Sequence, residues 1–368
     1  MIGLLIIPLC ISCIKDEALT AEADISSATI EDAAELLHGD PIINNQTVTF
    51  RLKDYQDSYE FAPQFKLSPG ATIEPASGTE FDFLTPQQYT VTSEDGAWQK
   101  TYKVSFVVDN TILFKYSFEN VRVIDTNSPE GHYHEFFEYQ DGMEGERMDW
   151  DTANEGYNML AETLLEKGEE FTPAVYPTAQ TLDGYEGKGV KMQTKSTGSL
   201  GSWMQSPLAA GSMFLGYFKL EYPTIKSTRF GQPYSNKKAP KAVSGYFKYK
   251  AGAKFIVNNP PSELKKDTWD AYAILFEKRE EENYLLGNHN FEDPRMVSLA
   301  RISDDLRIET DEWLPFEMSF EYLNGKTFDP DAKYMYTIVF SSSKEGDRFN
   351  GAPGSMLWID EVELITEE

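Results

Sequence analysis

Apolar and polar residues alternate along most of this chain, as they do in a β-strand with one buried face. In the first third, two alternating runs, 89–92 and 101–108, flank Asp95-Gly96. An Asp-Gly pair between such runs predicts a β-hairpin. Strands at this spacing predict a small all-β sandwich over residues 20–109. This part contains no catalytic constellation, so we expect it to act as a spacer.

A second domain is predicted for residues 112–368. Its first strand is expected at 112–118, where Phe114, Tyr116 and Phe118 share a face. From residue 180 onward strands and turns follow one another, and eight strands are expected at 189–194, 213–222, 243–250, 271–277, 297–301, 316–322, 334–341 and 356–365. These strands predict a jelly roll of two packed antiparallel sheets, in which the first and last strands are neighbours.

Helical spacing of apolar residues is confined to a short stretch around 157–167. We therefore expect one short helix there. Asn154 and Glu155 precede it, and they are expected to cap its N-terminus.

A carboxylate interrupts the apolar face of the last strand. By alternation Trp358, Asp360, Val362 and Leu364 point to the same side. A buried carboxylate needs a hydrogen-bonding partner or a metal ion. Asp360 is therefore the clearest local sign of chemistry in the chain.

Charge and cysteine content exclude several classes of function. The chain has 368 residues and a formal net charge of -27, so it repels the phosphates of nucleic acids, and we expect no nucleic-acid partner. Its two cysteines are Cys10 and Cys13, and the four histidines are scattered. This excludes a Cys/His zinc site and a cysteine nucleophile in either domain. His132-x-His134 is a weak metal pattern, and a solvated loop is its simpler interpretation.

The first nineteen residues have the character of an anchor segment. Residues 1–13 form an apolar run that is too short to span a bilayer. The run resembles a bacterial lipoprotein signal with a lipobox, although Cys10 stands where Leu is usual. The resemblance implies that Cys13 is the lipidated first residue. Lys15-Asp16-Glu17 is similar to the acidic export tag of surface lipoproteins of glycan-degrading Gram-negative bacteria. It implies attachment to the outer membrane by lipid alone, facing the cell exterior; an anchor facing the periplasm is the alternative.

Ordered motifs in both domains carry a family resemblance. FAPQFKLSPGATIEPASG followed by YTVTSEDGAWQKTYKVSF resembles the immunoglobulin-like domains that follow the anchor in such lipoproteins. The later motifs are W-x-T-x-N at 150–154, KMQT at 191–194, FLGYF at 214–218, RFGQP at 229–233, GYFKY at 245–249 and SSSKEGDRFNGAPGS before WIDEVEL. This set resembles the putative carbohydrate metabolism domain (PCMD) of surface lipoproteins in glycan-foraging gut bacteria, over residues 112–368. The resemblance implies a jelly roll similar to carbohydrate-binding modules, a glycan partner and a surface glycan-uptake complex.

The resemblance also implies a structural calcium ion. Carbohydrate-binding jelly rolls often hold calcium between a Glu of the first strand and an Asp of the last, and Glu119 and Asp360 resemble those positions. Calcium prefers hard oxygen ligands of this kind. Against it, alternation places Glu119 on the face opposite Tyr116 and Phe118. The alternative is that Asp360 bonds tyrosine or backbone groups without a metal.

Aromatic residues with polar neighbours are candidates for a sugar-binding surface. Pyranose rings stack on aromatic faces, and their hydroxyl groups need carboxylates, amides or arginine. The candidates are Trp150, Trp203, Tyr217, Tyr234 and Tyr246 for stacking, with Asn154, Gln193, Arg229 and Gln232 for hydrogen bonds. Trp150 and Trp203 are preferred, because both lie in polar, loop-like sequence. The alternative for each aromatic residue is a place in the core.

No catalytic residue can be assigned from the sequence. Glycoside hydrolysis needs two carboxylates close together, whereas Glu317 and Glu321 are about 13 Å apart along one strand. A cross-strand pair of Asp270 or Glu277 with Glu317 stays open. We therefore expect a glycan-binding lipoprotein. A glycoside hydrolase is one alternative, and an adhesin or assembly component with a protein partner is another.

Overall fold

The computed structural model describes residues 19–109, 111–123, 133–139, 145–165, 170–279 and 283–367. Most of the predicted anchor segment, including Cys13, and most of the loop that contains His132 lie outside these ranges. In the described part, no helix is long and apolar enough to cross a membrane. The chain forms two compact units. Of the described residues, the smaller unit comprises those up to Glu31 with Pro41–Phe50 and Ser58–Phe106, and the larger comprises Asp32–Asp40, Arg51–Asp57 and those from Val107 onward.

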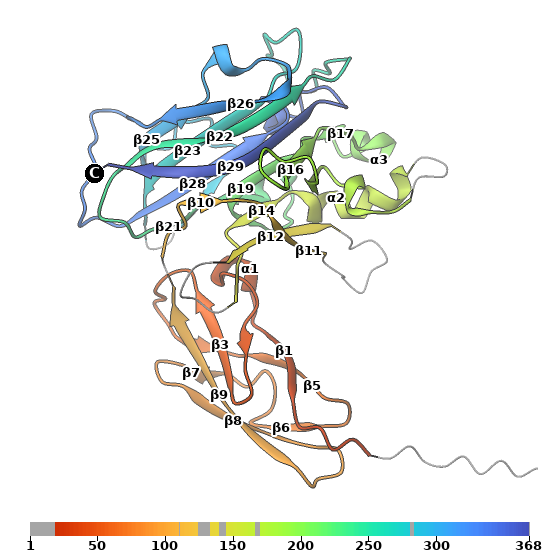
Figure 1. Ribbon diagram of the computed structural model, residues 1–368, viewed down its shortest axis with the longest axis vertical. Coiled ribbons are helices and arrows are strands. Elements are labelled where there is room, and N and C mark those ends of the chain that lie inside the picture. The colour runs from red at the N-terminus through yellow and green to blue at the C-terminus, as the bar shows by residue number, and fades with distance from the viewer. Residues whose placement is uncertain are drawn as a thin grey trace, which may run out of the picture. The chain divides into compact units, whose positions relative to one another are not determined.

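The smaller unit is built of short antiparallel strands (Figure 1). Its main sheet has the order β2 (Ile42–Ile43), β3 (Thr47–Leu52), β9 (Gln99–Val108), β8 (Gln87–Thr92) and β6 (Thr72–Glu74). Two further pairs are β1 (Ile25–Thr29) with β5 (Gln64–Leu67) and β4 (Glu60–Phe61) with β7 (Phe81–Asp82). The hairpin predicted at Asp95-Gly96 is confirmed, since Thr92 pairs with Gln99 and Gly96 has a φ of 70°.

Two large antiparallel sheets form the larger unit, and they confirm the predicted all-β architecture (Figure 1). The sheet that we call the β29 sheet has the order β15 (Thr178–Thr181), β16 (Gly189–Gln193), β29 (Met356–Thr366), β22 (Pro240–Lys250) and β26 (Thr310–Ser319), with β10 (Lys115–Tyr116) also on β29. The prediction that the first and last strands of this domain are neighbours is thus confirmed, because Tyr116 of β10 pairs with Val362 of β29.

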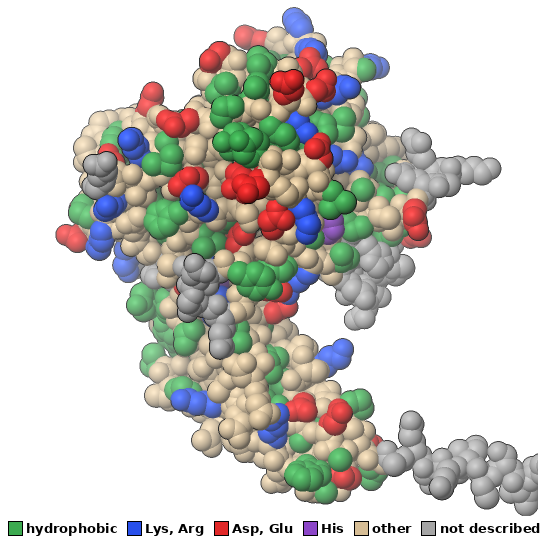
Figure 2. Space-filling model, in the orientation of Figure 1, with side chains coloured by type: hydrophobic (Ala, Val, Ile, Leu, Met, Phe, Trp, Pro, Cys, Tyr) green, Lys and Arg blue, Asp and Glu red, His purple; other side chains and the backbone are tan. Residues whose placement is uncertain are grey.

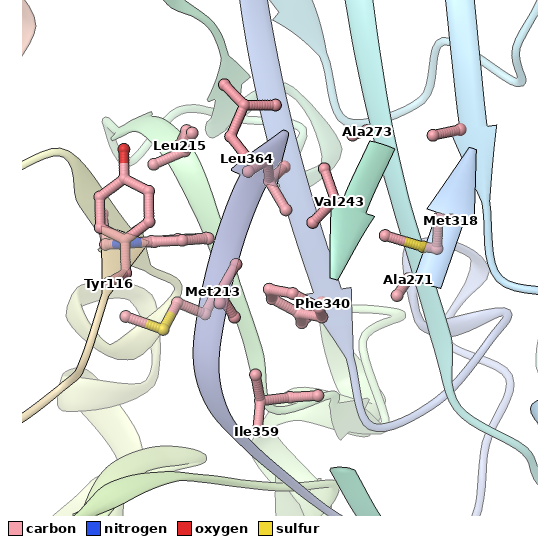
Figure 3. Packing of buried hydrophobic residues seen from close by; sticks show 14 of the residues in the cluster. Tyr116, Met213, Leu215, Val243, Ala271, Ala273, Met318, Phe340, Ile359 and Leu364 are labelled. Carbon is pink, nitrogen blue, oxygen red and sulfur yellow. The ribbon is translucent and has the colours of Figure 1, made fainter. Parts of the chain in front are cut away.

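The second sheet, which we call the β28 sheet, has the order β24 (Leu285–Leu286), β20 (Thr228–Phe230), β19 (Ser212–Phe218), β28 (Tyr334–Ser341), β23 (Asp270–Glu277), β25 (Met296–Arg301) and β27 (Glu321–Tyr322). Two short strands join it, β14 (Trp150–Thr152) on β19 and β21 (Gln232–Tyr234) on β28. The main core lies between the sheets, and Figure 3 shows Met213, Leu215, Val243, Phe340 and Ile359 meeting there.

Both faces of the β28 sheet are covered. A second apolar cluster on its other face contains Phe214, Phe218, Phe230 and Val339. As a result, seven consecutive residues of β28 are buried, and its alternation is lost. A strand buried on both sides needs a further layer over its outer face. That layer encloses the cavity described below.

The remaining elements are short. The larger unit also contains α1 (Ala33–Leu36), β11 (Asn120–Val123), β12 (His134–Tyr139), β13 (Glu146–Arg147), α2 (Asn154–Ala161), β17 (Lys195–Ser196), α3 (Gly198–Trp203) and β18 (Leu208–Ala209). The predicted helix is confirmed as α2, but it starts earlier than expected. Its expected cap is wrong, because Ala153 is the N-cap and the Asn154 amide bonds the backbone of Thr178 instead. The glycine- and serine-rich α3 shows no apolar period that could have predicted it.

A β-bulge changes the face of Asp360. Glu361 has a φ of 49°, and the register between β22 and β29 shifts at this point, so one extra residue is inserted in β29. Ile359, Val362 and Leu364 belong to the main core, so Asp360, which follows Ile359 in the strand, points to the other side. The prediction that Asp360 shares a face with these two residues is therefore wrong. A single bulge reverses the alternation on which it depended.

Candidate functional site

The outer face of the β28 sheet carries a cavity of about 860 Å³. Its floor comes from β19, β28, β23 and β25, and its lining includes Phe214, Val339, Tyr272 and Arg301. Three groups of residues form its walls: α2 with the segment 197–210, the loop 287–292, and the segment 343–349. All of these belong to the larger unit. The volume is typical of a site for a small organic ligand.

An ion-paired carboxylate lies in the floor of the cavity. Asp270 is only 4% exposed, and its Oδ2 accepts a hydrogen bond from Arg301 Nη2 at 2.7 Å. Its Oδ1 accepts a second from Arg307 Nη2 at 2.6 Å. The two guanidinium groups compensate the buried charge, which would otherwise be costly. The Arg301 guanidinium also lies 4.4 Å from the centre of the Phe291 ring, so its position and orientation are fixed.

The closing motif SSSKEGDRFNGAPGS forms one wall, and a single buried carboxylate organises it. Asp267 Oδ2 accepts hydrogen bonds from Ser343 Oγ at 2.6 Å, from Ser355 Oγ at 2.7 Å and from the Ala352 N–H at 2.7 Å. The Thr268 N–H donates to Oδ1 at 2.9 Å. Both ends of the motif are thereby held at one point. The residues between them, 344–349, face the cavity.

Asp347 is the second carboxylate of interest. It lies in the short 3₁₀ helix Gly346–Arg348 and lines the cavity. Asp347 remains exposed, and partial desolvation by the surrounding groups raises its pKa, whereas the neighbouring Arg348 lowers it. The pKa of Tyr272 is raised well above its usual value by burial and by the charges of Asp270 and Asp347. Among the carboxylates that line the cavity, Asp270 is thus ion-paired and Asp347 has a raised pKa.

His289 supplies a neutral donor in the loop wall. Its Nδ1 accepts a hydrogen bond from the Phe291 N–H at 2.9 Å, which leaves the proton on Nε2. Burial lowers the pKa of His289 to about 4, so the ring is neutral at physiological pH. Its ring packs edge-on against Phe230, Tyr272 and Phe291. The cavity therefore combines aromatic faces with polar groups of both signs.

Comparison with known proteins places the chain in a family. The model of the putative carbohydrate metabolism domain matches residues 117–365, which is more than half of the chain. The chain belongs to this family. The model described as SGBP, N-terminal, matches residues 24–105. None of the curated proteins matches.

Two solved structures are similar to large parts of this chain. A crystal structure titled as a putative glycoside hydrolase from Bacteroides thetaiotaomicron is 40% identical, covers 96% of this chain and 99% of its own, and has a TM-score of 0.66. Another with that title, from Bacteroides vulgatus, is 34% identical, covers 69% of this chain and 98% of its own, and has a TM-score of 0.59. The resemblance read from the sequence motifs is thereby confirmed.

Three of the predicted sugar-binding residues are instead part of the packing. Trp150 is 7% exposed in β14, and its ring contacts those of Tyr116, Phe118 and Phe340. The expectation that Trp150 stands in a loop is wrong, because its strand pairs with β19. Tyr234 is also buried and donates its hydroxyl to the Lys238 carbonyl at 2.7 Å, and Asn154 is buried in its bonds to Thr178. None of the three lines the cavity.

The other six predicted residues are dispersed over the larger unit; of these, Gln193 lies in β16 and Gln232 in β21, both outside the cavity lining. Arg229 lies beside the rings of Tyr217 and Tyr284, 5.5 and 5.3 Å from their centres, and pairs with Glu221 at 2.6 Å. Tyr217 and Arg229 are thus engaged with neighbours outside the cavity lining. Trp203 is 81% exposed at the end of α3, next to residues that line the cavity. Tyr246 lies on the β29 sheet.

The predicted carboxylate pair is also corrected. Asp270 and Glu277 lie on β23 of the β28 sheet, whereas Glu317 lies on β26 of the β29 sheet. The two strands belong to different sheets, so no cross-strand pair forms. The structure brings Asp270 together with Asp347 in the lining of one cavity. Asp347 lies in the closing motif SSSKEGDRFNGAPGS, and the distinctiveness of that motif was the one feature of the sequence that could have pointed to this residue.

Glu119 and Asp360, the predicted calcium ligands, hold the same loop. Asp360 Oδ2 accepts the N–H groups of Tyr185 at 2.7 Å and Glu186 at 3.0 Å, and Glu119 Oε1 accepts that of Lys188 at 2.7 Å. Burial raises the pKa of Asp360 to about 6, against these donors. Among the described residues, no three acidic, histidine or cysteine side chains cluster as metal ligands. The arrangement fits a loop held by amide donors better than a calcium centre, and calcium stays a prediction.

Asp360→Asn separates these two interpretations. An amide side chain has one acceptor oxygen in place of two, so at least one N–H loses its partner. We expect the free energy of unfolding to fall by about 1–3 kcal/mol, with or without a chelator. Thermal unfolding of both proteins with and without EDTA measures this. If EDTA alone destabilises the wild type as much as the substitution does, calcium binds there and our interpretation fails.

Proposed function

We propose that this chain is a surface-associated protein that binds a glycan in the cavity on the β28 sheet. The observation that carries the proposal is the cavity lining, in which aromatic rings stand beside fixed hydrogen-bonding groups. Tyr272 and Phe291 offer faces for sugar rings, and Arg301, His289 and Asp347 offer partners for hydroxyl groups. The carbohydrate-related family and the titles of both similar structures support a glycan as ligand.

Attachment to the membrane belongs to the same proposal. The match to the SGBP N-terminal model supports a surface-associated protein. We propose a lipid on Cys13, attachment to the outer membrane facing the exterior, and a place in a glycan-uptake complex. Membrane fractionation of a Cys13→Ser variant tests the anchor, because loss of the lipid should release the protein.

Hydrolysis is the second candidate, and one observation favours it. A glycosidase needs a carboxylic acid that stays protonated and a second carboxylate that is ionised. Asp347, with its raised pKa, and Asp270, paired with two arginines, line the same cavity. The double ion pair of Asp270 argues against a nucleophile, because both of its oxygens are occupied. Binding without cleavage is therefore our first candidate.

A glycan panel on which retention and new reducing ends are both recorded tests the proposal. We expect retention of at least one glycan without new reducing ends. The Asp347→Asn variant should weaken that retention about 3- to 10-fold, because an amide is a weaker acceptor than a carboxylate. Asp331→Asn changes an exposed carboxylate outside the cavity and serves as the matched control.

Other outcomes of the panel point elsewhere. Reducing ends that wild type releases and Asp347→Asn does not would make the protein a hydrolase. A folded protein that neither retains nor cleaves any glycan would overturn the proposal, and a protein partner would then be the remaining candidate.

A further inference from the structure

A second hollow lies on the β29 sheet, away from the cavity. This groove of about 560 Å³ is lined from β22, β26, β29 and the loop that contains Tyr185. Figure 2 shows hydrophobic, acidic and basic side chains intermixed on the side where these strands face the viewer in Figure 1. The proposed function makes no use of this groove.

Aromatic rings form the wall of the groove. Tyr185 stacks on Tyr246 with ring centres 3.5 Å apart and planes 7° apart, and Trp313, outside the lining, meets Tyr185 edge-on at 6.5 Å. Tyr185 is 48% exposed, so its side chain remains open to a ligand. An exposed aromatic side chain that is held in one orientation binds with little loss of conformational entropy.

The buried carboxylate of Asp360 and the half-buried carboxylate of Glu119 fix this arrangement. They accept three backbone N–H groups of the loop 185–188, and the Gly184 N–H closes the turn on the Gly187 carbonyl at 3.1 Å. Burial of a carboxylate costs free energy, and here the cost is offset by bonds that hold the loop carrying Tyr185. The buried charge of Asp360 thus has a structural consequence at the surface.

Acceptor groups dominate the polar lining. Four glutamates line the groove, Glu186, Glu317, Glu361 and Glu363, and no lysine or arginine is among its described lining residues. Lys115 lies beside it and reaches Glu363 at 3.7 Å, with both side chains exposed. A ligand that fits must bring an apolar face and several donors, and it must carry no negative charge. A neutral pyranose ring meets all three conditions.

We propose that this groove is a second glycan-binding site, which accepts neutral pyranose rings and rejects uronic acids. It is independent of the cavity, because the two sites lie on different sheets and share no lining residue. A protein with two such sites would hold a polysaccharide at two points.

The test uses the Arg301→Ala background, in which the cavity is impaired. Neutral oligosaccharides of glucose, galactose and mannose are compared with oligogalacturonate in equilibrium binding to the folded protein. We expect residual binding of a neutral oligosaccharide, and a further loss of at least 10-fold in Tyr185→Ala. Tyr322→Ala, which changes a tyrosine of similar exposure outside the groove, should leave this binding unchanged.

A charge-matched pair tests the selectivity. Glu317→Gln should increase the affinity for oligogalacturonate several-fold, whereas Glu312→Gln, on the same strand but outside the groove, should not. The proposal fails if the background binds no neutral sugar, if Tyr185→Ala binds as well as its parent, or if oligogalacturonate binds as tightly as neutral sugars. If instead Tyr185→Ala removes all glycan binding in the otherwise wild-type protein, the proposal of a glycan site in the groove is supported and the proposal of a glycan site in the cavity fails.

Discussion

Replacement of Asp267 by alanine is expected to lower the free energy of unfolding of the larger unit by about 3–5 kcal/mol. The carboxylate is buried and accepts four hydrogen bonds, from Ser343, Ser355, Ala352 and Thr268. Alanine would leave two backbone N–H groups and two hydroxyl groups buried without their acceptor. Denaturant unfolding followed by tryptophan fluorescence measures the loss.

Asp267→Asn is the matched control for this prediction. Its amide oxygen can take the position of Oδ2, which accepts three of the four bonds, so we expect about half of the loss. Both variants should also weaken glycan retention, because Asp267 holds Ser343 and Ser355, which flank the wall segment 344–349. A loss below about 1 kcal/mol for Asp267→Ala would show that the motif keeps its conformation without this carboxylate.

Replacement of Arg301 by alanine is expected to weaken glycan binding in the cavity about 10- to 100-fold. Arg301 is the half-exposed guanidinium of the floor, held by Asp270 and by the Phe291 ring, so its free N–H groups are preorganised for ligand oxygens. A hydrogen bond to a charged donor is worth about 1.5–3 kcal/mol, which corresponds to this range. Titration calorimetry with the best glycan of the panel measures the change.

Arg229→Ala is the control that the chain itself offers. Arg229 is also stacked on aromatic rings and paired with a carboxylate, but it lies outside the cavity lining. Equal losses in both variants would contradict the cavity as the site and would return attention to the residues chosen from sequence. Arg301→Lys should be intermediate, because lysine keeps the charge but not the planar group that stacks on Phe291.

The alternation of apolar and polar residues predicted the architecture well and the site poorly. It was sufficient for the all-β class, for the hairpin at Asp95-Gly96 and for the pairing of β10 with β29. It failed wherever a strand is buried on both faces. In β19 and β28 an apolar residue gives no indication of which face it covers, so the cavity floor could not be located from the pattern.

Candidate residues were missed for a related reason. Trp150 was chosen for its polar neighbours, yet the strand pairing of β14 carries it into the core. Asp270 was considered, but with a partner from the wrong sheet, because the order of strands in space is not the order in the chain. Asp347 lies in the most distinctive motif of the sequence, whose hydrogen-bonded form depends on Asp267, eighty residues earlier.

The sequence by itself determined the local properties of this protein: its strands and turns, its acidity, the absence of cysteine chemistry from both domains and its family. These follow from residue type and spacing along a few neighbouring positions. Only the tertiary structure decided which residues meet. The bulge at Glu361, the double burial of the β28 sheet and the approach of Asp270 to the closing motif all depend on contacts between distant segments, and such contacts leave no period in the sequence.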